Sequence, residues 1–344
     1  MNAVAARKNN VTMLTPRAAN PVANCKALIA DRLSKTAQRF KNPLQDACHH
    51  HLRSNGKMLR GQLAVRAASV AGADLSNAVE WATAVELLHN ATLIHDDICD
   101  RDETRRGQPS VAHRFGTQVA LCLGDALISE GFAAARRYSD RQETLDALNL
   151  AINELAEGQA SEFSCTHYPS VDQCFEIAVK KTGPLFTLPV CGALQLSDGG
   201  FAVDDAREYL NACAIAFQAM NDLSNFDVNS FYNSPSSDFA KLRPNIAISL
   251  FVYSLDNTTR HDFDTLYGSL KRPNHGTAHS ARLMEQFWNM FSGSVALRSA
   301  LSLTKIKVGA ADQLFARLDP QTADVVSPLH SWLLATSAGT TLIH

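Results

Sequence analysis

The sequence predicts an all-α protein, and three observations lead to this fold class. Apolar residues recur every three or four positions from about Pro21 onward, strictly alternating stretches are scarce, and helix caps and prolines divide the chain at helical intervals. A period near 3.6 residues gathers apolar side chains on one helix face, which neighbouring helices can then bury. We therefore expect a bundle of helices with a shared apolar interior.

Capping residues and prolines set the expected helix boundaries. Asp74 is placed to cap a helix that reaches Asp97. Pro184 lies inside another expected helix, where its missing amide hydrogen should bend the chain near Lys181. A segment rich in Asn, Ser and Pro, 229–237, is expected to be a loop. The expected helices cover 22–40, 43–53, 59–72, 74–97, 109–138, 142–166, 171–196, 203–226, 243–256 and 277–291.

Length and composition indicate a large globular chain. The 344 residues are 46% hydrophobic and 19% charged, so we expect a disordered tail over 1–20 and a single helical domain over 21–344. The net charge of −2 gives no general attraction to nucleic acid or an anionic membrane. No apolar run approaches the ~18 residues of a membrane span.

Eight cysteines without a C-x-x-C pair favour reduced thiols and a cytoplasmic location. The adjacent His49, His50 and His51 are interpreted as surface residues, because their rings point in different directions on a helix.

Three carboxylates gather where one apolar helix pattern ends. Asp96 and Asp100 are four residues apart on one helix face, and Asp97 lies about 100° around the helix, within reach of the same ion. Carboxylates that leave room for water and phosphate oxygens suit Mg²⁺ better than Zn²⁺ or a caged Ca²⁺. The paired Arg105 and Arg106 would bind phosphate oxygens beside the metal. A solvated acidic helix end is the alternative, and the apolar lead-in and paired arginines argue against it.

This motif and the upstream Gly56-Lys57-x-x-Arg60 resemble the trans-isoprenyl diphosphate synthase (polyprenyl synthetase) family, from about Gly56 to Asn245. The resemblance implies an isoprenoid synthase-like helical bundle around a central apolar cavity, usually as a homodimer. It also implies an Mg²⁺-dependent prenyltransferase that condenses an allylic prenyl diphosphate with isopentenyl diphosphate.

The resemblance assigns roles to individual residues. The metal-binding and catalytic set would be Asp96, Asp97, Asp100, Arg105, Lys181 and Gln218, with Arg105, Lys181 and Gln218 at the allylic diphosphate. Isopentenyl diphosphate would be held by Gly56, Lys57, Arg60, His89 and Arg106. Further substrate contacts are implied for Thr182, Phe217 and Arg243.

The second aspartate-rich motif departs from the family pattern. Where the family has D-D-x-x-D, this chain has Asn221-Asp222-Leu223-Ser224-Asn225. Asn221, Asp222 and Asn225 remain candidate ligands, but a neutral amide binds a hard dication more weakly than a carboxylate does. We therefore expect weaker binding or changed geometry of a third metal ion. Further on, Arg243 and Asn245 stand where the family has lysine and threonine.

These departures leave two other functions open. Class I terpene cyclases carry an N-D-x-x-[ST]-x-x-x-E triad, and Asn221, Asn225 and Asn229 have its spacing but match only its first member. Retention of the isopentenyl residues favours the prenyltransferase, because a cyclase does not use them. A non-catalytic subunit of a heteromeric synthase is less favoured, because such subunits commonly lose the first motif.

Product length is predicted from the residues one turn before the aspartates. Ala91 and Thr92 are small where short-chain members of the family place an aromatic floor, so a growing tail could pass. Leu88, one turn further, could stop it. We expect a product of C20 or longer, with C15 if other helices close the cavity.

Overall fold

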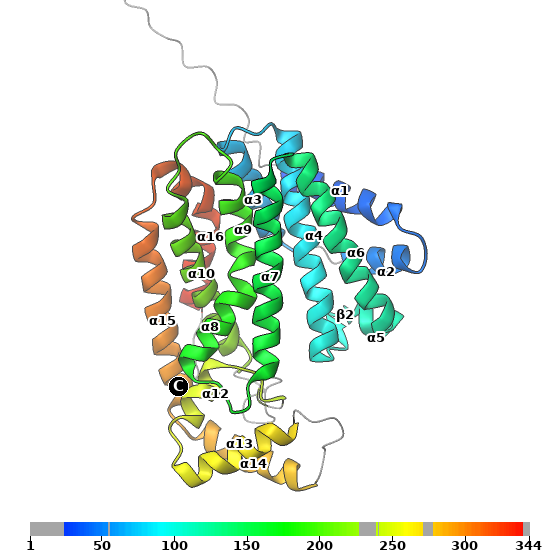
Figure 1. Ribbon diagram of the computed structural model, residues 1–344. Helices are drawn as coiled ribbons and strands as arrows, with labels where there is room; N and C mark the ends of the chain where they lie inside the picture. Colours follow the sequence, from blue (N-terminus) through cyan, green and yellow to red (C-terminus); the bar gives the residue numbers. More distant parts are fainter. Residues whose placement is uncertain (1–23, 54–55, 227–238, 240, 271–277, 340–344) are drawn as a thin grey trace, which may run out of the picture.

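The computed structural model describes residues 24–53, 56–226, 239, 241–270 and 278–339, and most of these residues are helical. The predicted all-α fold class is confirmed. Figure 1 shows the long helices running side by side along one axis. In chain order the helices are α1 (Cys25–Arg39), α2 (Leu44–Leu52), α3 (Leu59–Val70), α4 (Leu75–Asp100), α5 (Val111–Phe115), α6 (Thr117–Tyr138), α7 (Gln142–Ser164), α8 (Val171–Thr182), α9 (Pro184–Leu194), α10 (Val203–Ser224), α12 (Ile246–Val252), α13 (Asn257–Leu270), α14 (Ala278–Ser292), α15 (Ala296–Phe315) and α16 (Pro320–Gly339).

Local sequence signals explain several boundaries. The Asp74 carboxylate accepts a hydrogen bond from the Asn77 amide at 2.8 Å, as expected of the residue that caps α4. The helix expected over 109–138 is instead two helices, because Gly116 adopts φ +90° between α5 and α6. The helix expected over 171–196 is also divided, with Pro184 as the first residue of α9.

Several elements were absent from the sequence-based expectation. These are α13, α15, α16 and a hairpin of β1 (Thr104–Arg105) and β2 (Gln108–Pro109). In the hairpin, Arg106 and Gly107 both have positive φ, as a tight two-residue turn requires. The expected tail over 1–20 and the expected loop over 229–237 lie outside the described residues, so both stay predictions.

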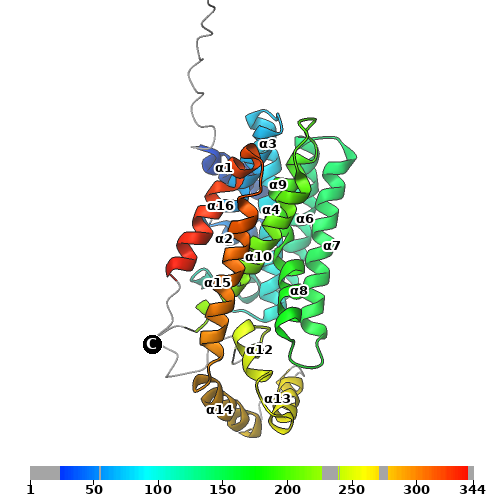
Figure 2. The ribbon, with the colours of Figure 1, turned by 90° about the vertical axis from the view of Figure 1, so that its left-hand side faces the viewer.

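The main hydrophobic core lies around α4, which packs chiefly against α6 and α3. Trp81 is fully buried there and donates a hydrogen bond from Nε1 to the Pro189 carbonyl at 3.0 Å, which ties α4 to α9. A second, aromatic cluster that includes Phe239, Phe263 and Phe291 forms where α12, α13 and α14 meet the ends of α10 and α15. Figure 2 shows these shorter helices at the end of the bundle where α10 finishes.

The interpretation of the three adjacent histidines as surface residues is wrong for two of them. His50 and His51 are buried, and each fastens α2 to another element. His50 Nε2 lies 2.8 Å from the Pro109 carbonyl, and His51 Nε2 lies 3.0 Å from Asn90 Oδ1. Burial lowers the pKa of His51 to about 4, so this residue is neutral.

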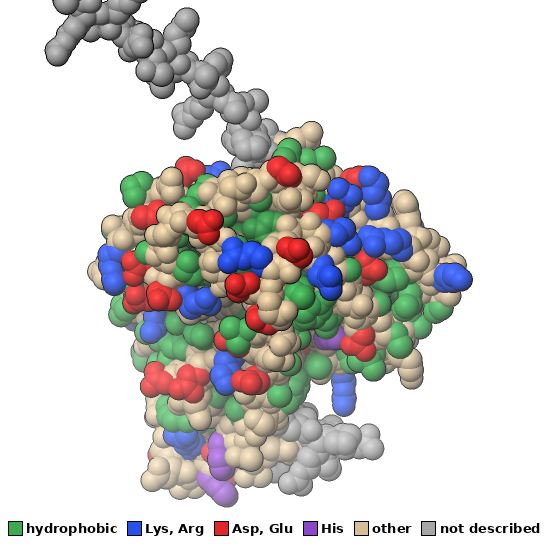
Figure 3. Space-filling view, turned by 45° about the horizontal axis from the view of Figure 1, so that its top comes forward, with side chains coloured by type: hydrophobic (Ala, Val, Ile, Leu, Met, Phe, Trp, Pro, Cys, Tyr) green, Lys and Arg blue, Asp and Glu red, His purple; other side chains and the backbone are tan. Residues whose placement is uncertain are grey.

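One described helix, α6, is long and apolar enough to cross a membrane by length and composition, contrary to the expectation that no segment approaches this limit. This is weak evidence for a span, because α6 packs along α4 and buries Leu123 and Leu127 completely. On the face shown in Figure 3, acidic and basic side chains are interspersed.

Candidate active site

The predicted aspartate cluster forms the last turn of α4. Asp97 is buried, and Asp96 and Asp100 line a cavity of about 850 Å³. Burial raises the pKa of Asp96 to about 6, with Lys181 opposing the shift and Asp100 adding to it. The pKa of Asp100 is also raised by burial. Asp96 and Asp100 are thus two carboxylates on one helix face whose ionised forms are disfavoured by burial. A bound cation would stabilise these ionised forms.

The hairpin after α4 brings Arg105 back to the acidic turn. Arg105 Nε donates to Asp97 Oδ1 at 2.8 Å, and Nη2 donates to the same oxygen. The other oxygen, Oδ2, is buried and has no hydrogen-bond partner among the described residues. The tight turn at Arg106 and Gly107 thus places Arg105 at the cavity of about 850 Å³. Arg106 lines both this cavity and a smaller pocket beside it, which is described below.

Lys181 reaches the same cavity from the end of α8. Its Nζ lies 2.6 Å from Glu162 of α7. Burial lowers the pKa of Lys181, but Glu162, Asp96 and Asp100 outweigh it and raise the pKa overall, so the ammonium stays charged. Gly158 permits this approach, because a Cβ there would lie 2.5 Å from the Lys181 backbone nitrogen.

The second motif forms the opposite wall, at the end of α10, and its remaining carboxylate contacts the protein interior. Asp222 is only 2% exposed. Its Oδ1 accepts from Gln218 Nε2 at 2.7 Å, and its Oδ2 accepts from the Ile246 amide at 2.9 Å, at the start of α12. Asn221 is exposed and lines the cavity, while Asn225 donates to the Asn221 carbonyl at 3.2 Å. This wall therefore presents the amides of Asn221 and Gln218 beside one carboxylate, Asp222, which lines the cavity while both of its oxygens accept hydrogen bonds from the protein.

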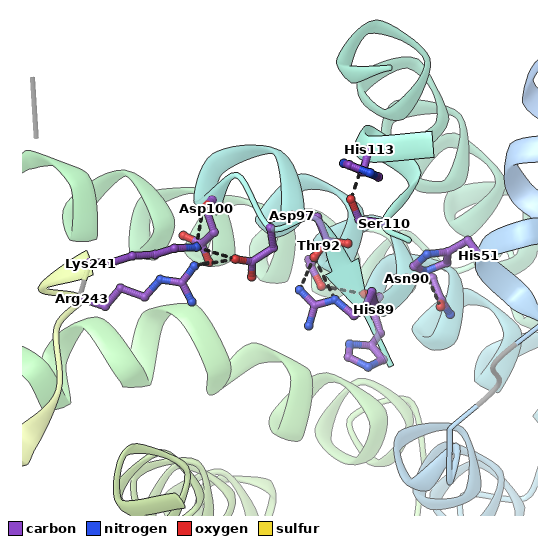
Figure 4. Close-up of polar contacts among 12 residues, drawn as sticks. His51, His89, Asn90, Thr92, Asp97, Asp100, Ser110, His113, Lys241 and Arg243 are labelled. Atoms are coloured by element: carbon purple, nitrogen blue, oxygen red, sulfur yellow. Dashed lines mark hydrogen bonds and ion pairs between the residues drawn. The ribbon is translucent and has the colours of Figure 1, made fainter. Parts of the chain in front are cut away.

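Two cations cross the mouth of the cavity from the segment before α12. Lys241 Nζ lies 2.8 Å from Asp102 Oδ1, and Arg243 Nη2 lies 2.9 Å from the same oxygen and 3.6 Å from Asp100 Oδ2. Figure 4 shows Lys241 and Arg243 reaching toward Asp100. Arg243 was expected at the site, whereas Asp102 and Lys241 were missed, because 139 residues separate them in the sequence.

The large cavity changes from polar to apolar with distance from the aspartates. Thr92 and Leu88 line it, whereas Ala91 is fully buried and is not among its lining residues. Residues of other helices complete its apolar part, including Ile128, Ile152, Leu155 and Leu185. Thr182, Phe217, Gln218 and Arg243 also line it.

A second pocket of about 250 Å³ adjoins the large cavity and shares Arg60, His89, Arg106 and Phe217 with it. The predicted residues Gly56 and Lys57 also line this pocket. Met58 adopts φ +50° directly before α3, and this left-handed turn directs the chain from Lys57 to Arg60.

The chemistry of the second pocket fits an anion. Burial lowers the pKa of Arg60 and lowers that of His89 well below its usual value, so His89 is neutral. Arg60 Nη1 lies 3.4 Å from His89 Nε2. Arg60 Nε and His89 Nδ1 are buried without hydrogen-bond partners among the described residues. Buried polar groups of this kind normally have partners, so a ligand with acceptor oxygens would complete them.

The acidic turn of α4 fits a divalent cation in its donor chemistry, because Asp96 and Asp100 are half-buried on one helix face and Asp97 Oδ2 lacks a partner among the described residues. Helices α4 and α10 both end here, and their carbonyl ends add negative potential. In the described arrangement, however, no three His, Cys, Asp or Glu side chains are grouped closely enough to enclose an ion.

The fold is a helical bundle with two adjoining pockets, one with an acidic mouth and one lined by cationic side chains. The chain belongs to the polyprenyl synthetase family, whose model matches residues 41–281. The resemblance inferred from the motifs is therefore confirmed.

Curated relatives and solved structures agree with this assignment. The chain is 34% identical over 198 residues to a short chain isoprenyl diphosphate synthase of Methanocaldococcus jannaschii, which covers 56% of this chain and 61% of the relative. It is 32% identical over 187 residues to a geranylgeranyl diphosphate synthase of Methanosarcina mazei, covering 52% and 58%. The chain thus spans about three fifths of the length of these relatives.

The fold is shared over a longer range. A geranylgeranyl pyrophosphate synthetase from Pyrococcus horikoshii superimposes with a TM-score of 0.75 over 92% of this chain and 96% of that one, at 24% identity. A decaprenyl diphosphate synthase from Rhodobacter capsulatus gives a TM-score of 0.77 over 93% and 98%, at 20% identity.

Proposed function

We propose that this protein is a prenyltransferase that joins an allylic prenyl diphosphate to isopentenyl diphosphate. The observation that carries this proposal is the pair of adjoining pockets with a shared wall. One has an acidic mouth and a long apolar interior, and the other is small and lined by Lys57, Arg60, His89 and Arg106. Condensation requires two diphosphates side by side, whereas a cyclase requires only one.

Mg²⁺ is the proposed cofactor, held by Asp96 and Asp100 with Asp97 nearby, and it would neutralise charge on the departing diphosphate. Lys181, Arg105 and Arg243 add fixed positive charge at the same mouth. The C–O bond of the allylic substrate breaks with its electron pair leaving on the diphosphate. The double bond of isopentenyl diphosphate then forms the new C–C bond to C1, and the adduct loses a proton to the released diphosphate. The apolar interior excludes water, which would otherwise capture the cation.

The cavity supports a product of C20 or longer. Thr92 is small and lines the cavity together with Leu88 and with apolar residues of α6, α7 and α9. A test of the chain-length prediction should compare Ala91→Phe with Leu88→Phe. Because Leu88 lines the cavity and Ala91 does not, we expect Leu88→Phe to shorten the product more.

We further propose a homodimer in the cytoplasm. The apolar helix α6 leaves Leu121 51% exposed, a surface that a second copy could bury. All eight cysteines, each within a described segment, are free thiols, which fits a reducing compartment. Sedimentation velocity of the wild type and Leu121→Glu tests the assembly, and a monomeric wild type would contradict it.

Product analysis by mass spectrometry tests the proposed reaction. The protein and Mg²⁺ are incubated with geranyl, farnesyl or geranylgeranyl diphosphate, each with and without isopentenyl diphosphate. We expect longer prenyl diphosphates only when isopentenyl diphosphate is present. Hydrocarbons or alcohols formed without it would favour the cyclase suggested by Asn221, and absence of any product would favour a non-catalytic subunit.

A further inference from the structure

The small pocket has a wall that the sequence motifs do not explain. Cationic residues occupy one side, and Phe186, Phe217 and Trp332 contribute aromatic rings to the lining. Trp332 comes from α16, the last described helix, which lies outside the matched residues 41–281. The pocket is therefore completed by a residue far from every motif.

The position of Trp332 is fixed by the packing of α16. Val325, Val326, Leu329 and Leu333 are fully buried on one face of this helix. This spacing of three and four residues anchors α16 in the main core and leaves Trp332 at the edge of the anchored face, half-buried.

Polar contacts hold α16 at two further points. Arg66 of α3 donates from Nε to the Val325 carbonyl at 3.1 Å and from Nη2 to the Asp324 carbonyl at 2.5 Å. His330 stacks on Phe315 at 3.8 Å between ring centroids, and its Nε2 lies 3.2 Å from Asp312. Trp332 is thus presented from a helix that α3 contacts through Arg66 and α15 contacts through Phe315 and Asp312.

The aromatic rings form a continuous row along the pocket. The ring centroids of Phe186 and Phe217 are 5.7 Å apart, as are those of Phe217 and Trp332. The Arg60 guanidinium lies 5.3 Å from the Phe186 centroid. The row begins beside the anion-binding cations and ends at Trp332, so the pocket suits a ligand with an anionic end and a short apolar end.

We propose that Trp332 contacts the hydrocarbon part of the five-carbon acceptor diphosphate and determines how well the small pocket binds it. This inference rests on the proposed prenyltransferase function, which supplies the acceptor. Aromatic rings bury apolar surface at low entropic cost, and loss of such a contact weakens binding of the apolar end without altering the phosphate contacts.

Steady-state kinetics test this role. Trp332→Ala should raise the KM for isopentenyl diphosphate by about ten-fold or more, with the KM for the allylic substrate within about two-fold of wild type. Trp332→Phe should restore most of the loss. Leu334→Ala, on the same helix at a side chain that is 38% exposed, controls for changes in α16 and should leave both KM values unchanged.

Tryptophan fluorescence provides a readout independent of turnover. The chain has three tryptophans, and Trp81 and Trp288 are buried away from the small pocket, so isopentenyl diphosphate should change the emission of Trp332. The change should be absent in Trp332→Phe. Inorganic pyrophosphate, which lacks the hydrocarbon, should bind wild type and Trp332→Ala equally.

The outcomes separate this inference from the proposed function. If wild type elongates an allylic substrate but Trp332→Ala keeps the wild-type KM for isopentenyl diphosphate, the role of Trp332 is wrong and the prenyltransferase stands. If Trp332→Ala weakened the binding of inorganic pyrophosphate as much as the binding of isopentenyl diphosphate, a contact with the hydrocarbon would also be contradicted. If wild type never consumes isopentenyl diphosphate, the proposed function itself fails.

Discussion

The two walls of the large cavity occupy equivalent positions at the ends of α4 and α10 but use their polar residues differently. On α4, Asp96 and Asp100 line the cavity and have raised pKa values because burial opposes their ionisation. On α10, Asp222 also lines the cavity, but it accepts one hydrogen bond from Gln218 within α10 and one from the Ile246 amide of α12, and Asn221 is neutral. We propose that Asp222 chiefly serves the fold and that Asp96 and Asp100 serve a metal ion, while metal binding by Asp222 stays a prediction from the sequence.

Replacing the carboxylates of the first wall should have the largest effect. Asp96→Asn and Asp100→Asn, separately, should each lower kcat by about 10²–10³-fold or more, because the leaving diphosphate loses its main source of charge neutralisation. Asp262→Asn, an exposed site on α13, is the matched control. Elongation assays at saturating Mg²⁺ measure the effect, and near-normal turnover in both α4 variants would remove the metal assignment.

The next prediction concerns the close approach of α7 to α8 at Gly158, because this approach positions Lys181 at the first wall. Gly158→Ala should displace α8, with a stability loss of ~1–3 kcal/mol and reduced turnover. Gly309→Ala, on α15 with no atom within 4 Å of the added carbon, should change stability by less than ~1 kcal/mol. Urea unfolding measures the stability of both variants, and elongation assays measure their turnover. Equal behaviour of the two would show that the contact at Gly158 does not constrain α8.

Asp222→Asn probes whether the second wall serves the fold. The new amide has only one accepting oxygen, so either one hydrogen bond is lost or the Gln218 amide must turn over to accept from the new side chain, and we expect a cost of ~1–3 kcal/mol. Chemical unfolding should show this loss, and the Mg²⁺ requirement of the folded protein should change little. Unchanged stability together with a large increase in the Mg²⁺ requirement would instead support the sequence prediction that Asp222 binds metal.

Restoring a carboxylate to the second wall should have the smallest effect. Asn221→Asp should lower the Mg²⁺ concentration for half-maximal activity by about three- to ten-fold, which corresponds to roughly 1 kcal/mol. Asn289→Asp, exposed on α14, has the same charge change away from the cavity. No gain over this control would indicate that the second wall has been altered for another purpose.

The sequence predicted most of what depends on short spacing. The helical period, the Asp74 cap and the clustering of Asp96 with Asp100 follow from contacts within one or two turns, and the structure places them accordingly. The sequence did not predict that Asp102 pairs with Lys241, because tertiary folding alone brings these residues together. Nor did it predict that Trp332 completes the small pocket.

The division of one expected helix into α5 and α6 shows a second limit. Periodicity continues across Gly116, and only the backbone conformation reveals the break. The histidines of α2 show a further limit of reading the sequence alone. Adjacent polar residues are expected at the surface, yet His50 and His51 are both buried because each has a separate hydrogen-bond partner.

Metal binding in the presence of inorganic pyrophosphate tests the contrast between the walls most directly. Mn²⁺, used as a paramagnetic substitute for Mg²⁺, is titrated into wild type, the double variant Asp96→Asn/Asp100→Asn, and Asp222→Asn, and bound Mn²⁺ is counted by electron paramagnetic resonance. We predict that the double variant loses pyrophosphate-dependent Mn²⁺ binding and that folded Asp222→Asn retains the wild-type number of ions. Retained binding in the double variant, or its loss in Asp222→Asn, would contradict the assignment of the metal to α4.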